Sequence, residues 1–417
     1  MRSCWVGHAA HPHWETAVDQ VLQQWREAMP WPQDTPLGLG LLYVTDYFSA
    51  IAPQVLDRLA NEWPGVAQWS GTVGVGVLAH GVEHIDTPAI AVMLCDVSTQ
   101  ACQVFGGATS WGQLRQQGFA VATAMLHADP QTPLLDEMVE ELADQTQQGA
   151  VFGGLSSSRG DHVQLARTAA TPKGEGVYQG GVCGVAWSPS VAMQTRITQG
   201  CAPIGVVHTI TTAKDNLVLT LNDAPALYAL MHTLDVPIDN PRSAVDKVRH
   251  TLVGLSAPDQ PVLRATGALQ DQAIVRHIIG LDPVRHGVAL AQAIEPGMQL
   301  TFCERNAASA KADLLRVVTE IRDSLEPQGD DLTVAGQHHV AGVAAPVKRI
   351  AGAVYISCTG RGGPFFGFAH AELQIIQRAL GDIPLVGFMA SGEIAHRQLY
   401  GYSGVLTVFF ADTNQAA

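Results

Sequence analysis

Charged residues, long apolar runs and basic clusters are scarce in this chain of 417 residues. Apolar runs such as Ala89–Cys95 are far shorter than the roughly 18 residues that a membrane-spanning helix needs. The formal net charge is −14 and no block of lysine and arginine occurs, which argues against nucleic acid and anionic membrane surfaces as partners. The N-terminal residues lack the apolar core of a secretion signal. We therefore expect a cytoplasmic protein that is not bound to membranes.

Paired cysteines are also missing. Seven cysteines occur singly, and none forms a C-x-x-C pair. This pattern is typical of the reducing cytosol rather than of a disulfide framework. The chain has no Walker-type phosphate loop and no strand-linked G-x-G-x-x-G followed by an acidic residue, so the sequence predicts no nucleotide cofactor.

One stretch has the spacing of a zinc peptidase motif. His80, Glu83 and His84 match H-x-x-E-H, which needs a helix to bring both imidazoles to one metal. Gly81 and Val82 stand between two predicted strands and oppose a helix. The sequence therefore argues against a helix and a metal site here.

The composition is 47% hydrophobic and 15% charged, which favours well-covered sheets over disorder. A chain of this length exceeds one ordinary core, so we expect two domains. Helical spacing over Trp14–Met29 is followed by a strand at Leu39–Val44, a helix ending near Trp63, and strands at Trp69 and Ala89–Cys95. The same order returns weakly over residues 119–187 and clearly over 314–410.

The predicted fold class is therefore α/β, with repeated helix-strand-helix-strand-strand units forming two related layered domains. We place an N-terminal helix and linker at residues 1–36, the domains at 37–221 and 222–411, and a tail at 412–417. Asn222 and Asp223 are predicted to cap a helix just after the boundary. Residues 326–334 are predicted to form an exposed loop.

One short sequence pattern recurs at the predicted strand end of each unit. Its copies are Trp69–Val75, Gly153–Arg159 and Gly387–Glu393. The last position differs, because Val75 is apolar whereas Arg159 and Glu393 are charged. Only the second and third copies can hold a charged ligand on this alignment.

Several spaced motifs carry a resemblance to a known family. Gly200–Gly205, Asn222–Leu227, Cys358–Gly362 and Gly387–Ile394 together resemble the FIST proteins, named for F-box and intracellular signal transduction. The resemblance covers roughly Leu37 to Ala411 and implies an N-terminal and a C-terminal FIST domain. It also implies a sensory module that binds small ligands such as amino acids. No output domain is recognisable in the sequence, so we expect a separate signalling partner. The first pattern copy departs from the family because it lacks an acid.

Arg361 and Glu393 are the leading candidate ligand-binding residues. Arg361 follows a buried-looking strand in a glycine-rich turn, where backbone N–H groups and a guanidinium can approach an anion together. Glu393 follows Ser391 and Gly392 at the next strand end. If these ends are neighbours, Arg361 can bind the carboxylate of an amino acid and Glu393 its ammonium. The alternative is that Arg361 and Glu393 pair with each other.

Ser156, Ser157 and Arg159 form a hydroxyl-rich turn with one cation, which suits a carboxylate or phosphate. The alternative is a solvated hairpin in which the serines cap backbone groups.

Cys358 lies before the Arg361 turn, and His370 starts the following helix, so a cysteine-dependent hydrolase is an alternative function. A buried packing cysteine and a thiol lining the pocket are the other interpretations. A third alternative is a non-catalytic structural protein that presents a surface to partners.

Overall fold

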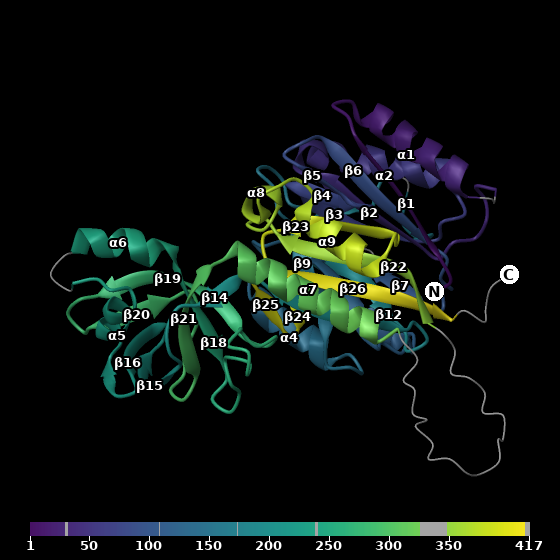
Figure 1. Ribbon diagram of the computed structural model, residues 1–417. Coiled ribbons are helices and arrows are strands. Elements are labelled where there is room, and N and C mark those ends of the chain that lie inside the picture. The colour runs from purple at the N-terminus through teal and green to yellow at the C-terminus, as the bar shows by residue number, and fades with distance from the viewer. Residues whose placement is uncertain (30–31, 108, 173, 238–240, 326–347, 413–417) are drawn as a thin grey trace, which may run out of the picture. The chain divides into compact units, whose positions relative to one another are not determined.

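The computed structural model describes residues 1–29, 32–107, 109–172, 174–237, 241–325 and 348–412 (Figure 1). The chain forms two compact units. The first contains residues 1–197, 314–398 and the C-terminal stretch from Gly404, and the second contains residues 198–313 and 399–403. The predicted loop at 326–334 lies outside the described residues, as does most of the predicted tail.

The first unit contains three sheets of six strands each. Every sheet is built around three strands of one sequence repeat. In each repeat the first of these strands pairs in parallel with the second and antiparallel with the third. The three sets are β2 (Leu39–Thr45), β3 (Trp69–Gly74) and β6 (Ala89–Cys95); β8 (Thr123–Ala128), β9 (Val151–Leu155) and β12 (Val182–Trp187); and β22 (Lys348–Cys358), β23 (Leu385–Ala390) and β26 (Ser403–Asp412). The predicted α/β class with three repeated units is thus confirmed.

Two helices belong to each repeat, although the periodicity of the middle repeat predicts only the second of them. They are α1 (Trp14–Ala28) and α2 (Ala52–Glu62), α3 (Trp111–Gln116) and α4 (Leu135–Asp144), and α7 (Ala307–Asp323) and α9 (Ala371–Leu380). Short helical turns η1 (Asp46–Ile51) and α8 (Gly363–Phe366) follow β2 and β22. The stripe of Val18, Val21, Leu22 and Trp25 on α1 is buried, so the apolar face read from the sequence is the face that packs.

Each repeat donates a hairpin to the sheet of another repeat. The hairpin β4 (Gly76–Ala79) and β5 (Val82–Ile85) of the first repeat pairs with β23 of the third. In the same way β10 (Val163–Arg167) and β11 (Val177–Gln179) extend β3, and β24 (Glu393–His396) pairs with β9 and is followed by β25 (Gln398–Tyr400). The exchange is cyclic, so each repeat covers a sheet edge of another. The stretch His80–His84 is not helical, as Gly81 and Val82 indicate, because it turns from β4 into β5.

The opposite edge of each sheet is closed by a strand that precedes the central ones along the chain. These strands are β1 (Cys4–Ala10) beside β6, β7 (Cys102–Phe105) beside β12, and β13 (Met193–Gln199) beside β26. The three sheets therefore have equivalent construction.

The second unit is built on a closed antiparallel sheet. Its order is β21 (Gln299–Arg305), β15 (His208–Lys214), β16 (Leu217–Leu221), β20 (Gly287–Leu290), β19 (Ile274–Asp282) and β18 (Thr251–Ser256), and β18 pairs again with β21. Strands β14 (Cys201–Pro203) and β17 (Ala224–Pro225) and helices α5 (Ala226–Thr233) and α6 (Pro241–His250) complete the unit. The predicted boundary near residue 222 lies inside this unit, between β16 and β17.

Asn222 and Asp223 do not cap α5, contrary to the sequence prediction. Both have positive φ, 49° and 65°, and form the turn that joins β16 to β17. Pro225 is the residue before α5, and it makes no side-chain cap. Asparagine and aspartate suit helix caps and left-handed turns alike, and here the turn conformation prevails.

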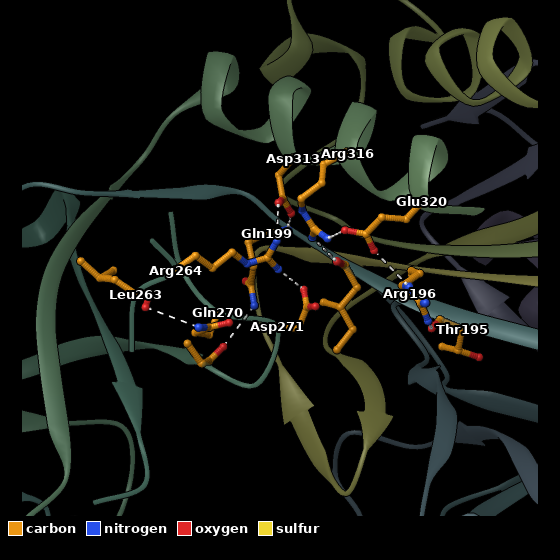
Figure 2. Close-up of polar contacts among 12 residues, drawn as sticks. Thr195, Arg196, Gln199, Leu263, Arg264, Gln270, Asp271, Asp313, Arg316 and Glu320 are labelled. Atoms are coloured by element: carbon orange, nitrogen blue, oxygen red, sulfur yellow. Dashed lines mark hydrogen bonds and ion pairs between the residues drawn. The ribbon is translucent and has the colours of Figure 1, made fainter. Parts of the chain in front are cut away.

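Ion pairs join distant segments within each unit (Figure 2). In the second unit Arg264 bonds to Asp271. In the first unit Glu320 bonds to Arg316 at 2.6 Å and to Arg196 at 3.2 Å, which links the segment before residue 198 to the segment after 313. All three side chains of this second group are partly exposed, so we expect each pair to contribute less than about 1 kcal/mol.

Candidate functional site

The three copies of the recurring pattern meet in the first unit. The Ser157 N–H donates to the Val73 carbonyl oxygen at 3.3 Å, and the Leu155 N–H donates to the Gly392 carbonyl oxygen at 2.8 Å. The Ser391 N–H in turn donates to the Leu155 carbonyl oxygen at 3.1 Å. The cyclic hairpin exchange explains this meeting, because each pattern leads from a central strand into a neighbouring sheet.

Strand register shows that the first copy of the pattern begins at Gly71. The sequence comparison places its beginning two residues earlier, at Trp69. Gly71, Gly153 and Gly387 occupy equivalent positions, because a Cβ atom on each would lie only 1.7, 2.0 or 1.6 Å from a carbonyl oxygen of the neighbouring parallel strand. Only glycine permits this approach. By strand pairing the counterpart of Glu393 is therefore Val77 in the first repeat and Gln164 in the second, and the comparison with Val75 was wrong.

The serines of the second and third copies bond to the backbone. Ser157 Oγ donates to the Met389 carbonyl oxygen and accepts from the Val75 N–H at 2.9 Å. Ser391 Oγ donates to the Ser156 carbonyl oxygen at 2.8 Å. Ser156 and Ser157 are both buried, so the turn is not a solvated hairpin. The Ser157 hydroxyl bonds the backbone as the alternative interpretation held, whereas Ser156 Oγ lies 3.0 Å from His162 Nδ1.

Arg159 is exposed and already engaged by acids. Its guanidinium lies 2.7 Å from Asp46 and 3.1 Å from Asp86, and it stacks over the Tyr47 ring at 5.0 Å. Asp46 accepts the backbone N–H of Arg159 as well, at 3.0 Å. The structure therefore gives Arg159 protein carboxylates as partners.

Arg361 lies at the centre of a buried polar network. Its Nε donates to Glu372 Oε1 at 2.9 Å, and Tyr355 and Ser357 donate to the two oxygens of the same carboxylate, each at 2.7 Å. Arg361 and Glu372 are only 1% and 2% exposed. Burial alone would lower the pKa of Arg361, but the charge of Glu372 outweighs it and raises the pKa above its usual range.

Glu393 and Cys358 are buried at neighbouring positions of the fold. Glu393 begins β24 opposite Gly154, and its charge also raises the pKa of Arg361. Cys358 ends β22 opposite Ala390 and is 6% exposed. The two strand ends after β22 and β23 are thus neighbours, as the sequence-based pairing of Arg361 with Glu393 assumed.

Glu83 on β5 approaches the start of helix α9 from another repeat. Its Oε1 accepts the backbone N–H of Glu372 at 3.1 Å and of Leu373 at 3.5 Å. Its Oε2 is buried, and the Gly363 backbone N–H adds a further hydrogen bond to the carboxylate. Burial, followed by the charge of Glu372, raises the pKa of Glu83 to about 7, although the helix N–H groups oppose the shift.

A cavity of about 450 Å³ opens beside Glu83. The hairpin contributes Glu83, Ile85 and Asp86 to its wall, and the segment from Gly363 to His370 contributes the other side. A volume of this size suits a small organic ligand. The cavity follows the carboxyl end of β22, the region where the sequence places the ligand.

One histidine, His370, lines this cavity, and His84 on β5 and His8 on β1 form a pair nearby. His370 Nδ1 accepts the Glu83 N–H at 3.0 Å, so this nitrogen carries no proton. His84 Nε2 lies 2.9 Å from His8 Nδ1. Burial, followed by the charges of His8 and His370, lowers the pKa of His84 to about 4, so this pair is neutral at pH 7.

Two family models match the chain. The FIST N domain matches residues 38–224 and the FIST C domain matches residues 238–396, which together span most of the chain. The chain belongs to the FIST family. It is 28% identical to the uncharacterized protein Mb0898c of Mycobacterium bovis over 90% of this chain and 99% of that protein. It is 27% identical to the uncharacterized protein Rv0628c of Mycobacterium tuberculosis over 85% of this chain and 88% of that protein.

Both FIST regions build the cavity. Glu83, Ile85 and Asp86 come from the FIST N match, and the segment 363–370 comes from the FIST C match. Because β5 belongs to the first repeat and α9 to the third, the cavity exists only through the hairpin exchange.

Sequence reasoning missed Glu83 as a ligand candidate and missed Glu372 entirely. In the sequence Glu83 attracts attention only as part of a zinc-type motif. The signal that could have marked it as a ligand-binding residue is a single acid within a short strand. Glu372 looks like any acid in the first turn of a helix. Among the described residues, no three histidine, cysteine or acidic side chains are placed to hold a metal ion. The described helices also include none with the length and apolar character to cross a membrane.

Proposed function

We propose that this FIST protein is a sensory protein that binds a small ligand in the cavity beside Glu83 and signals through a separate partner. The observation that supports the proposal is the cavity of about 450 Å³, whose wall combines Glu83, Ile85 and Asp86 of the hairpin with the segment from Gly363 to His370. A concave site of this size with a few polar groups in its wall is where a small ligand is expected to bind.

The cavity also suits a sensor, because its two walls come from different repeats. Its walls are the β4–β5 hairpin of the first repeat and the α8–α9 segment of the third. A ligand that contacts both walls stabilises the conformation in which the two walls lie together. Ligand binding therefore increases the population of that conformation, which a signalling partner can recognise. Amino acids and related small metabolites are the first ligands to test, because their amino group matches an acid in the wall.

We assign the ammonium-binding role, which the sequence suggested for Glu393, to Glu83. Glu393 is fully buried, whereas Glu83 belongs to the cavity wall. Arg361, Ser156, Ser157, Ser391 and Gly392 support the site in this proposal by holding the strand ends and α9 in place.

The test is a thermal-shift screen of amino acids and small metabolites. A ligand at one hundred times its Kd stabilises the folded state by about 2.7 kcal/mol, which is readily measured. Ala369→Trp fills the cavity, because Ala369 lies in its wall, and should abolish the shift. The matched control is Ala257→Trp, at an exposed position of the second unit, which should keep the shift.

Absence of any stabilising compound for the wild type contradicts the proposed function. A compound that stabilises both tryptophan variants equally contradicts the assignment to this cavity.

A further inference from the structure

Two cysteines face each other at the edge of one sheet in the first unit. Edge strand β1 pairs antiparallel with β6 (Figure 1), and Cys4 lies directly opposite Cys95. The side chains of such a pair leave the same face of the sheet, with Cβ atoms about 4.5–5.5 Å apart. The two thiols are hydrogen-bonded to each other, and both side chains are buried. Their sulfur atoms are therefore close enough to bind one metal ion together.

Two methionine sulfurs extend this pair. The Cys4 thiol donates to Met1 Sδ at 3.4 Å. Met93 precedes Cys95 by two residues on β6, so both side chains leave the same face of the sheet. A Cβ atom on Gly352 of β22 would lie 2.7 Å from Cys4 Sγ and 3.4 Å from Met93 Sδ, so these two sulfurs are near neighbours. We call Met1, Cys4, Met93 and Cys95 the sulfur cluster.

The donor atoms of the sulfur cluster favour a soft metal ion. Among the described residues, no histidine or acid joins the two cysteines to make a group of three that could hold a metal. Leu39 on β2, which lies opposite Cys95 on its other side, is fully buried and apolar. Hard cations such as Mg²⁺ and Ca²⁺ need oxygen ligands. Thiolate and thioether sulfur instead select Cu(I).

A cavity of about 450 Å³ adjoins the sulfur cluster. Its wall includes Met1 and Arg2, just before β1, and Asp96 and Val97, just after β6. Met1 thus belongs to the cavity wall and also contacts the Cys4 thiol. A buried metal site needs an entry path, and this cavity supplies one that passes a thioether before it reaches the cysteines.

A second cysteine pair lacks these features. In the second unit Cys201 and Cys303 are also hydrogen-bonded to each other. Cys201 lies opposite Arg305, however, and only diagonally from Cys303. Both thiols belong to a hydrophobic cluster whose described members include no methionine. This pair therefore provides a matched control for the sulfur cluster.

We propose that the sulfur cluster binds one Cu(I) ion, with the thiolates of Cys4 and Cys95 as the principal ligands and the thioethers of Met1 and Met93 as additional ligands. Each thiol releases its proton to solvent as it coordinates the metal, so two neutral thiols and one Cu(I) give a complex with a single negative charge. The metal keeps its oxidation state. The site shares no residue with the cavity beside Glu83 and does not depend on the ligand proposed there.

The experiment is an anaerobic competition titration of the full, reduced chain against bathocuproine disulfonate, a chelator whose Cu(I) complex is coloured. We expect the wild type to withdraw one Cu(I) per chain from the chelator. Cys4→Ser and Cys95→Ser should each weaken Cu(I) binding at least about a hundredfold, because serine removes a thiolate ligand. Met93→Leu keeps the apolar volume and should weaken binding about tenfold.

The matched control is Cys303→Ser, which removes a buried thiol from the other pair and should leave Cu(I) binding unchanged. If the serine variants of the sulfur cluster do not fold, X-ray absorption of the copper-loaded wild type identifies the ligands directly, and we expect sulfur neighbours alone. Nitrogen neighbours around the copper overturn the proposal. So does a wild type that takes no Cu(I) from the chelator, or a loss of binding in Cys303→Ser that Cys4→Ser does not share.

Discussion

Two buried glutamates meet at the first turn of α9, and they differ in how their oxygens are satisfied. Both oxygens of Glu372 accept hydrogen bonds, from Tyr355, Ser357 and Arg361. Glu83 instead accepts from backbone N–H groups, those of Glu372, Leu373 and Gly363, and its pKa is raised to about 7. Burial is similar for the two, at 2% and 6% exposure, so burial alone does not mark a site. The difference teaches that a buried acid without a cation partner bears the cost of its own charge, whereas an acid bonded to a guanidinium is part of a completed structural network.

The largest effect should come from breaking the completed network. Arg361→Ala leaves the Glu372 carboxylate buried without its cation, and we expect the free energy of unfolding to fall by about 3–5 kcal/mol in urea denaturation. Arg159→Ala is the matched control, because Arg159 also binds acids but is exposed, and it should change the free energy of unfolding little. Equal losses for the two variants would remove the distinction between the Glu372 network and a surface ion pair.

Removing the charge of Glu83 should raise the free energy of unfolding, in contrast to Arg361→Ala. The folded-state pKa of about 7 exceeds the ordinary 4.5, so the ionised carboxyl destabilises the folded state above pH 7, and this cost disappears below about pH 4.5. Without ligand, Glu83→Gln should therefore raise the free energy of unfolding by about 1–3 kcal/mol at pH 8 and change it little at pH 4. Urea denaturation at both pH values checks this, with Glu137→Gln, at an exposed position of α4, as the control. A loss of stability at pH 8 would show that Glu83 is as well satisfied as Glu372.

An effect smaller than that of Arg361→Ala should follow from removing a single donor to Glu372. Tyr355→Phe deletes the 2.7 Å bond from the phenol to Oε1 while keeping the ring in place. Because the acceptor is charged and buried, we expect a loss of about 1.5–3 kcal/mol in urea denaturation. Tyr228→Phe, at an exposed position of the second unit, should be close to neutral. If Tyr355→Phe is also neutral, the Tyr355 bond contributes little to the network.

The repeats and most of their elements could be predicted from the sequence. The period of apolar residues located α1, β6 and α9 within a few residues, because a helix or strand face that packs against a core must be apolar at its own spacing. The recurring glycine pattern also marked equivalent strand ends. Its alignment in the first copy failed by two residues, because the close approach of Gly71 to a neighbouring carbonyl oxygen is visible only from strand register.

The candidate site was predicted in part. The sequence directed attention to Arg361 and to the strand ends near Glu393, and the structure places both in the same region of the first unit. It could not reveal Glu372 as the partner of Arg361, since the first turn of any helix favours an acid. Nor could it reveal that Glu83, nearly three hundred residues away along the chain, caps α9.

By itself, the sequence determined the class of fold, the number of α/β units and the resemblance to the FIST family, because periodicity and short motifs are local properties of the chain. The tertiary structure decided which repeat supplies a hairpin to which sheet, and hence where the cavity lies. The physical reason is that any sheet edge can accept any suitable hairpin, so pairing depends on the packing of whole units. The exchange of β4 and β5 into the third sheet brings an acid from one FIST region to the helix start of the other, and no pattern within either region contains that contact.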